Sequence, residues 1–337
     1  MKSKRLYTFI FFLILIARGY GQQDPQFSQF MYTILPINPG IAGTAGICAS
    51  LHYRQQWAGF YDEDTLGHKY KVSPRDIMLT LHTPLKKSHS SLGLTVYNDS
   101  YGQQSDITVK LAYSYRMNVF GGVLGAGISA DLLSRKVYTD RFWGGGWSTD
   151  PTILANMGKS DMYVDMSFGV YYLMQNKWYA GISGTNLIAA IGGDKINQKA
   201  SRHFYVIGGY EYVIPANPNW TLKPQALLKT DLKVVPQIDV VLIADWVDMI
   251  WFGASYRAID AVVLLAGAKP FANYTNPLRG LEVAVSYDIT TSKLGREGRS
   301  FGGFEFGIKY CFKIVPPIRI EWYKGTRLLG NRPIEYR

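Results

Sequence analysis

The sequence predicts an all-β protein: a transmembrane antiparallel outer-membrane β-barrel of about 14 strands, with an N-terminal plug-like segment and a short periplasmic C-terminal tail. Three observations carry this prediction. Apolar and polar residues alternate strictly in many segments, the segments are even in number, and most connections between them alternate between long and tight. With 34 Gly, 24 Tyr and 14% aromatic residues, the composition is also typical of many strands and turns.

Residues 1–21 have the pattern of a secretory signal peptide. A basic start of two lysines and an arginine precedes an apolar run over residues 6–17, and glycines stand where the cleavage site is expected. The apolar run is shorter than the roughly 20 residues that a membrane-spanning helix needs. We therefore expect cleavage after Gly21. Because no cysteine follows the cut, we expect no lipid anchor there.

Residues 22–46 form an aromatic segment with almost no charge before the first strand, and we expect it in the periplasm or inside the barrel. The functional interpretation is a plug or collar: aromatic side chains bury against the lumen wall, prolines stiffen the path, and Asp and Asn cap turns. The alternative is a mobile linker, although disordered linkers seldom carry so many aromatics. The residues that we expect to form the plug or to contact a partner are Asp24, Pro25, Gln26, Phe27, Phe30, Met31, Asn38 and Pro39.

The alternation is clearest over residues 107–116, where every second residue is apolar for about ten residues. The patterns over 281–288 and 304–312 are similar. A wall that faces lipid outside and water or polar groups inside has this pattern. A soluble sandwich also alternates, but it does not usually need so many long strands in one exported chain.

The predicted barrel covers residues 47–313, and its even strand number lets it close with both ends on one side. Long polar connections over 59–74, 137–161, 188–201 and 290–299 are expected outside the cell. The tight connections over 117–120, 173–177 and 245–248 are expected in the periplasm. The predicted strands are 47–58, 75–84, 90–98, 104–117, 120–136, 162–173, 177–187, 202–213, 219–230, 236–245, 248–257, 260–269, 277–289 and 300–313.

Parity places charged residues of both signs inside the barrel. A mixed interior suits salt-bridged packing or a plugged bore more than an ion-selective channel, which favours rings of one sign. The alternative is that these residues solvate an open pore. The residues placed inside are Arg54, Lys110, Arg116, Asp131, Arg135, Asp165, Lys223, Lys229, Asp239, Asp245, Arg257, Glu282, Asp288, Glu305 and Lys309.

The two cysteines are expected at the periplasmic end of the barrel. Cys48 begins the first strand and Cys311 ends the last, and parity points both inward. Because the first and last strands of a closed barrel are neighbours, a disulfide between them can staple the seam in an oxidising compartment. Two separate lumen thiols are the alternative.

The loops offer candidate contacts. Phe142, Trp143 and Trp147 surround a run of glycines in the longest loop, and exposed tryptophans suggest a surface contact. Packing of this loop over its own barrel mouth is the alternative. Arg296 and Arg299 can meet acidic lipopolysaccharide or a partner, or can simply be solvated.

The sequence gives little support to catalysis or nucleic-acid binding. Its five His residues are scattered without metal-ligand spacing, and neither a Gly-x-Ser-x-Gly elbow nor a P-loop occurs. The formal charge of +11 becomes 11 − 4 = +7 after removal of residues 1–21, and no basic run is interleaved with stacking aromatics. We expect no enzyme activity, no cofactor, no metal site and no nucleic-acid partner.

The end of the last predicted strand resembles the signal by which outer-membrane barrels are recognised for insertion into the membrane. Gly307, Tyr310 and Phe312 resemble the Gly-x-x-aromatic-x-aromatic pattern of outer-membrane barrels. The signal is not terminal, because the basic residues 314–337 follow it. Pro316 and Pro317 end the strand, so this tail is expected in the periplasm.

Several motifs carry a family resemblance. DPQFSQFM at 24–31, Asn38-Pro39 and YRQQW at 53–57 look like the start of the PorP/SprF family of outer-membrane proteins. The later half agrees through WFGASYR at 251–257 and GGFEF at 302–306. The resemblance covers essentially the whole mature chain, and the basic tail after Phe312 is longer than the family pattern suggests.

Membership would imply a role in the type IX secretion and gliding motility machinery of Gram-negative bacteria, in the outer membrane and with both termini periplasmic. Some family members link to periplasmic partners, namely ring proteins and peptidoglycan-linked proteins. Others hold a secreted adhesin at the surface through its C-terminal sorting domain. Outer-membrane lipid and lipopolysaccharide are further expected contacts. The alternative from another class is a passive outer-membrane porin.

Overall fold

The computed structural model describes residues 26–63, 69–85, 88–102, 104–137, 160–174, 176–188, 201–233, 235–258, 260–272, 277–291 and 300–312. The predicted signal peptide, Asp24, Pro25, the loop residues Phe142, Trp143 and Trp147, Arg296, Arg299 and the tail 314–337 lie outside these residues. No helix within the described part of the chain is long and apolar enough to cross a membrane.

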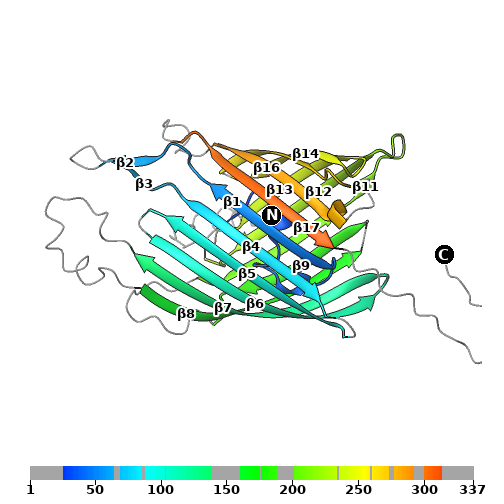
Figure 1. Ribbon diagram of the computed structural model, residues 1–337, viewed down its shortest axis with the longest axis horizontal. Coiled ribbons are helices and arrows are strands. Elements are labelled where there is room, and N and C mark those ends of the chain that lie inside the picture. The colour runs from blue at the N-terminus through cyan, green and yellow to red at the C-terminus, as the bar shows by residue number, and fades with distance from the viewer. Residues whose placement is uncertain are drawn as a thin grey trace, which may run out of the picture.

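A closed antiparallel β-barrel of 14 strands forms the molecule, with β10 and β11 counted as one strand that is interrupted at Glu211 (Figure 1). Each strand pairs with its neighbour in sequence, except where the small β2–β3 hairpin lies between β1 and β4. The wall strands are β1 (Ile47–Gln55), β4 (Arg75–Pro84), β5 (Ser90–Tyr101), β6 (Gln104–Val119), β7 (Gly122–Val137), β8 (Ser160–Met174), β9 (Trp178–Thr185), β10 (His203–Tyr210), β11 (Tyr212–Val213), β12 (Trp220–Thr230), β13 (Gln237–Trp246), β14 (Ile250–Arg257), β15 (Ala261–Ala268), β16 (Leu281–Thr290) and β17 (Gly303–Phe312).

The first and last strands close the barrel. β1 pairs antiparallel with β17 over its whole length, from Ile47 opposite Phe312 to Gln55 opposite Phe304. We call the end at Ile47 and Phe312 the proximal end and the opposite end the distal end. The β2 (Tyr61–Glu63) and β3 (Lys69–Lys71) hairpin extends from the distal end (Figure 1).

Alternation sets the two faces of the wall, as predicted. In β4 and β8 buried and exposed residues alternate one by one. Large apolar side chains such as Leu111, Ile182 and Leu264 are 53–60% exposed on the outer face, as a lipid-facing surface requires. The charged residues that parity placed inside are all buried or half-buried.

The boundaries differ from the prediction in a few places. The strand expected from residue 277 begins at Leu281, because Pro277–Gly280 form a 3-10 turn first. The β2–β3 hairpin within 59–74 was not predicted, since three-residue strands are too short to show alternation. The tight β6–β7 turn was predicted, and its residues Phe120 and Gly121 have φ of 50° and 78°, which suits a two-residue hairpin.

Candidate functional site

Residues 26–46, which we call the inner segment, lie inside the barrel. The inner segment contacts the distal half of the wall at Gln26 and Ser28 and reaches the proximal end at Gly43, just before β1 begins. Two short 3-10 helices, η1 (Phe30–Tyr32) and η2 (Pro39–Ile41), shape its path. The buried Phe30 and Ile34 join the apolar cluster formed by Tyr205, Leu227 and other inward side chains of β8–β16. The inner segment thus packs against inward side chains of the wall.

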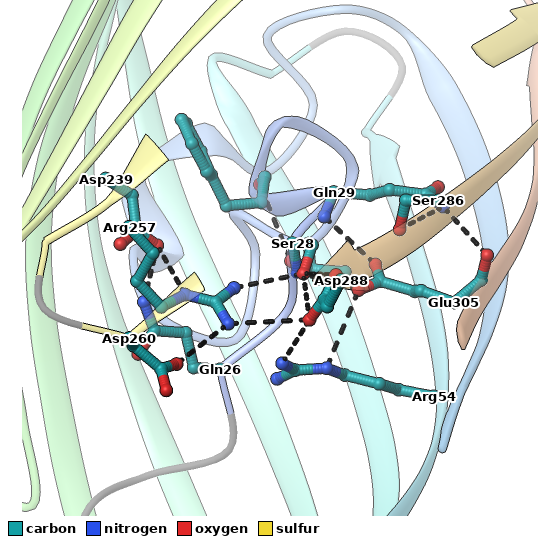
Figure 2. A network of polar contacts seen from close by, with 12 residues as sticks. Gln26, Ser28, Gln29, Arg54, Asp239, Arg257, Asp260, Ser286, Asp288 and Glu305 are labelled. Carbon is teal, nitrogen blue, oxygen red and sulfur yellow. Dashed lines mark hydrogen bonds and ion pairs between the residues drawn. The ribbon is translucent and has the colours of Figure 1, made fainter. Parts of the chain in front are cut away.

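At the distal end, wall residues hold the start of the inner segment by polar contacts (Figure 2). The backbone N–H groups of Ser28 and Gln29 donate to the two carboxylate oxygens of Glu305, at 2.7 and 3.0 Å. The Ser28 hydroxyl donates to Asp288 at 2.8 Å, and the Gln26 amide donates to Asp239. Because Glu305 is 2% exposed, its two charge-assisted hydrogen bonds are shielded from bulk water.

Two arginines hold these carboxylates in place (Figure 2). Arg54 Nη2 lies 2.9 Å from Asp288 Oδ2, and Arg257 Nη2 donates to the Ser28 hydroxyl at 3.0 Å. Arg257 also lies 3.5 Å from Asp239 and from Asp288. Buried charges need such partners, because leaving one alone costs several kcal/mol, roughly 3–5. We call Arg54, Asp239, Arg257, Asp288 and Glu305 the distal clamp.

In the middle of the bore, the inner segment fits against wall glycines of β7, β8 and β9. The Asn38 amide donates to the backbone carbonyls of Val170 at 3.0 Å and Ile182 at 3.4 Å, and its oxygen caps η2 by accepting from Gly40 N–H. A Cβ atom added at Gly125 would lie 2.1 Å from Gly40 O, and one added at Gly169 would lie 2.2 Å from Asn38 Oδ1. The wall lacks side chains where the backbone of the inner segment approaches most closely.

Near the proximal end, other wall groups bind the inner segment's backbone. Arg116 donates to Gly43 O at 3.1 Å, and Gly43 N–H donates to His82 Nδ1 at 3.1 Å. Farther toward the distal end, Lys110 donates to Pro36 O at 3.1 Å. Tyr32 donates to Glu282; burial, followed by the charge of this carboxylate, raises the pKa of Tyr32 well above its usual value, so the phenol stays a donor.

One small cavity lies between the inner segment and the wall. Its volume is about 40 Å³, and it is lined by Phe27, Phe30, Ile37, Met78, Tyr205 and Leu227, among others. A space of this size holds only a few water molecules. Among the described residues, no group of three or more His, Cys, Asp or Glu side chains is placed to hold a metal ion.

The seam between β1 and β17 carries a covalent link. Cys48 and Cys311 are directly opposite each other in the strand register, and their sulfur atoms form a disulfide. Cys48 is 3% exposed and lies near the proximal end. The link joins residues separated by 263 positions in the sequence.

Most of the predicted segment residues lie together in the bore. Gln26 is half-buried at the distal clamp, Phe27, Phe30, Asn38 and Pro39 are buried, and Met31 packs against the apolar cluster. Sequence reasoning missed Ser28 and Gln29, which make the backbone contacts to Glu305. It also missed the wall glycines. The alternation of the strands places Gly125, Gly127 and Gly169 at inward positions, so a close approach of another segment to the wall could have been predicted there.

Comparisons with known proteins give a family and distant structural neighbours. The family model described as type IX secretion system membrane protein PorP/SprF matches residues 19–310. No curated protein matches the chain. Among solved structures, the Acinetobacter baumannii outer membrane protein Omp33 is 7% identical, with a TM-score of 0.43, and the alignment covers 80% of this chain and 100% of that chain.

Two toluene transporters are similar at the same level. TodX of P. putida is 9% identical with a TM-score of 0.44, over 82% of this chain and 93% of that chain. TbuX of Ralstonia pickettii is 9% identical with a TM-score of 0.47, over 82% and 92%. The family match, by contrast, spans nearly the whole barrel and the inner segment. Its members are secretion-system membrane proteins and not a class of enzymes. The chain therefore belongs to the PorP/SprF family of type IX secretion system membrane proteins.

Proposed function

We propose that this chain is a plugged, non-conducting outer-membrane barrel of the type IX secretion and gliding machinery, and that its function is to bind other proteins. It would hold a secreted surface protein, such as an adhesin, through that protein's C-terminal sorting domain, or link the outer membrane to periplasmic components. The observation that carries the proposal is the position of the inner segment, which hydrogen-bonds to the wall from its distal to its proximal end.

The position of the inner segment favours this function over a passive porin. A porin needs a continuous water-filled path, whereas here the inner segment lies within the bore and one cavity beside it has a volume of about 40 Å³. Several charges of the wall are paired with one another, as in Arg135 with Asp106 at 2.7 Å and Lys223 with Asp245 at 2.7 Å. Paired charges stabilise packing and do not form rings of one sign that would select ions.

We assign the two ends of the barrel to different partners. The distal end, where Gln55 ends β1, faces the cell surface in this proposal, and the aromatic loop residues Phe142, Trp143 and Trp147 remain the candidate contact for the secreted protein. The inner segment then begins on the cell-surface side of the bore, which differs from the periplasmic N-terminus that the resemblance implied. The proximal end faces the periplasm, where the basic tail 314–337 would meet ring or peptidoglycan-linked proteins. Arg296 and Arg299 remain candidates for contact with lipopolysaccharide.

Affinity capture from gently solubilised outer membranes tests the proposal. A tag within residues 290–299 leaves the tail free, and mass spectrometry identifies what accompanies the tagged chain; untagged membranes are the control. A large secreted protein with a C-terminal sorting domain supports the surface-anchor role, and periplasmic ring or peptidoglycan-binding proteins support the linking role. Recovery of nothing above the control contradicts both roles.

A further inference from the structure

The distal clamp has more negative than positive charge. Asp76, which is 2% exposed and lies opposite Arg54 in the register, adds a fourth carboxylate to Asp239, Asp288 and Glu305. Against these stand two arginines, so the formal charge is 2 − 4 = −2. Counting the edge residues Lys229 and Asp260 leaves it unchanged, at 3 − 5 = −2. A buried excess of two negative charges is costly unless protons or a cation compensate it.

The inner segment supplies only neutral donors to these carboxylates. The Gln26 amide binds Asp239, the Ser28 hydroxyl binds Asp288, and two backbone N–H groups bind Glu305. One oxygen of Asp239, Oδ1, has no hydrogen-bond partner although the residue is only 1% exposed. Neutral donors therefore occupy positions where a charged donor would bind more strongly, since charge-assisted hydrogen bonds are about twice as strong as neutral ones.

Two residues that contact the distal clamp are exposed to solvent at the distal end. Gln26 is half-buried, and the Asp260 side chain, which lies 3.4 Å from Arg257, is 45% exposed. The described residues offer no arrangement for a metal ion here. A guanidinium or ammonium group on an incoming polypeptide would supply positive charge here.

We propose that the distal clamp is the docking site for an arginine- or lysine-bearing segment of the secreted partner, which replaces Gln26 and Ser28 as donors to Asp239 and Asp288. This inference rests on the proposed function, because it names the chemistry of the partner that the barrel binds. The incoming cation neutralises part of the buried excess. The start of the inner segment is then displaced, while Asn38 and Gly40 keep their places among the wall glycines.

Matched peptides test the proposal on the full chain in detergent. The probe is a short fluorescent peptide with two arginines between glycines, and the control peptide has citrulline, the neutral isostere, in place of each arginine. At low salt the arginine peptide is expected to bind at least about tenfold more tightly. It should also accelerate hydrogen exchange of the Ser28 and Gln29 amides. Equal affinity of the two peptides overturns the proposal.

Wall variants locate the binding site. Asp239→Asn and, independently, Asp288→Asn are expected to weaken arginine-peptide binding by about tenfold. Asp248→Asn, at an exposed proximal turn, removes the same charge elsewhere and should leave binding unchanged. Binding that is equal in all variants places the peptide outside the clamp and overturns the inference. If capture finds a secreted partner but the peptides do not discriminate, only the inference fails; if the peptides discriminate but capture finds no partner, the proposed function fails.

Discussion

Replacing Gly125 by alanine is expected to loosen the inner segment while leaving the wall intact. Gly125 lies in β7, where the backbone of Gly40 approaches the wall most closely. A Cβ atom at this position would lie 2.1 Å from Gly40 O and 3.3 Å from the Ser114 hydroxyl. Because the nearest atom belongs to the backbone, a side-chain rotation cannot relieve the clash, and the inner segment must move by about 1 Å.

The cost follows from two contributions. Overpacking of a well-packed site costs about 1–3 kcal/mol. The movement also breaks the hydrogen bond from Ser114 to Gly40 O, now 3.3 Å, which contributes about 1 kcal/mol. Docking of the inner segment is then weaker by about 2–4 kcal/mol, which raises its open population by about 30- to 700-fold.

Hydrogen exchange followed by mass spectrometry measures this effect directly. Backbone amides of the inner segment that are bonded within it, such as Thr33 to Phe30 O and Asn38 to Ile34 O, should exchange faster by about the same factor. Gly208→Ala is the matched control, since a Cβ there meets nothing closer than Tyr179 O at 3.6 Å. Exchange in Gly125→Ala that is no faster than in Gly208→Ala would refute the packing argument.

Three further predictions concern the wall. Arg257→Ala removes a partner of Asp239 and of Asp288 and should destabilise the barrel by about 3–5 kcal/mol. The loss is measured as a lower temperature for the heat-induced mobility shift on gels, and Lys177→Ala, at an exposed position, should have almost no effect. Leu264→Arg, on the outer face, should lower the stability of the barrel in bilayers by about 2–4 kcal/mol. Leu232→Arg, at a residue that is 74% exposed in a distal turn, should lower it by less than about 1 kcal/mol, and equal losses would contradict the membrane placement. Unfolded protein kept without reductant should not be alkylated at Cys48 or Cys311, and the mass should rise by two adducts only after reduction; alkylation without reductant would mean that the disulfide does not form in the native protein.

The strands were predictable because each carries its own signal. In the predicted strand 104–117 every second residue from Ile107 to Tyr115 is apolar, and β6 covers 104–119 with Leu111 outside and Lys110 inside. Parity then fixes the inward face of every strand, so the lumen charges follow from the same pattern. Short elements such as Tyr61–Glu63 carry no comparable signal.

The contacts of the bore were less predictable, because they join distant parts of the chain. Ser28 and Glu305 are 277 positions apart, and nothing local to either one specifies the other. The aromatic and proline content of residues 22–46 indicated burial but not the direction of the path, which runs from the clamp down to the proximal end. Asn38 was predicted as a turn cap, and its second role, donation to Val170 O, depends on the absence of a side chain at Gly169.

Single-channel recording of the unmodified protein in planar bilayers tests the central claim most directly. The claim is that the inner segment and the wall form one closed body, held at the distal clamp and at the wall glycines. It predicts no steady conductance above that of the bare bilayer. A stable, ohmic conductance from the purified chain would contradict the claim and would favour a passive porin.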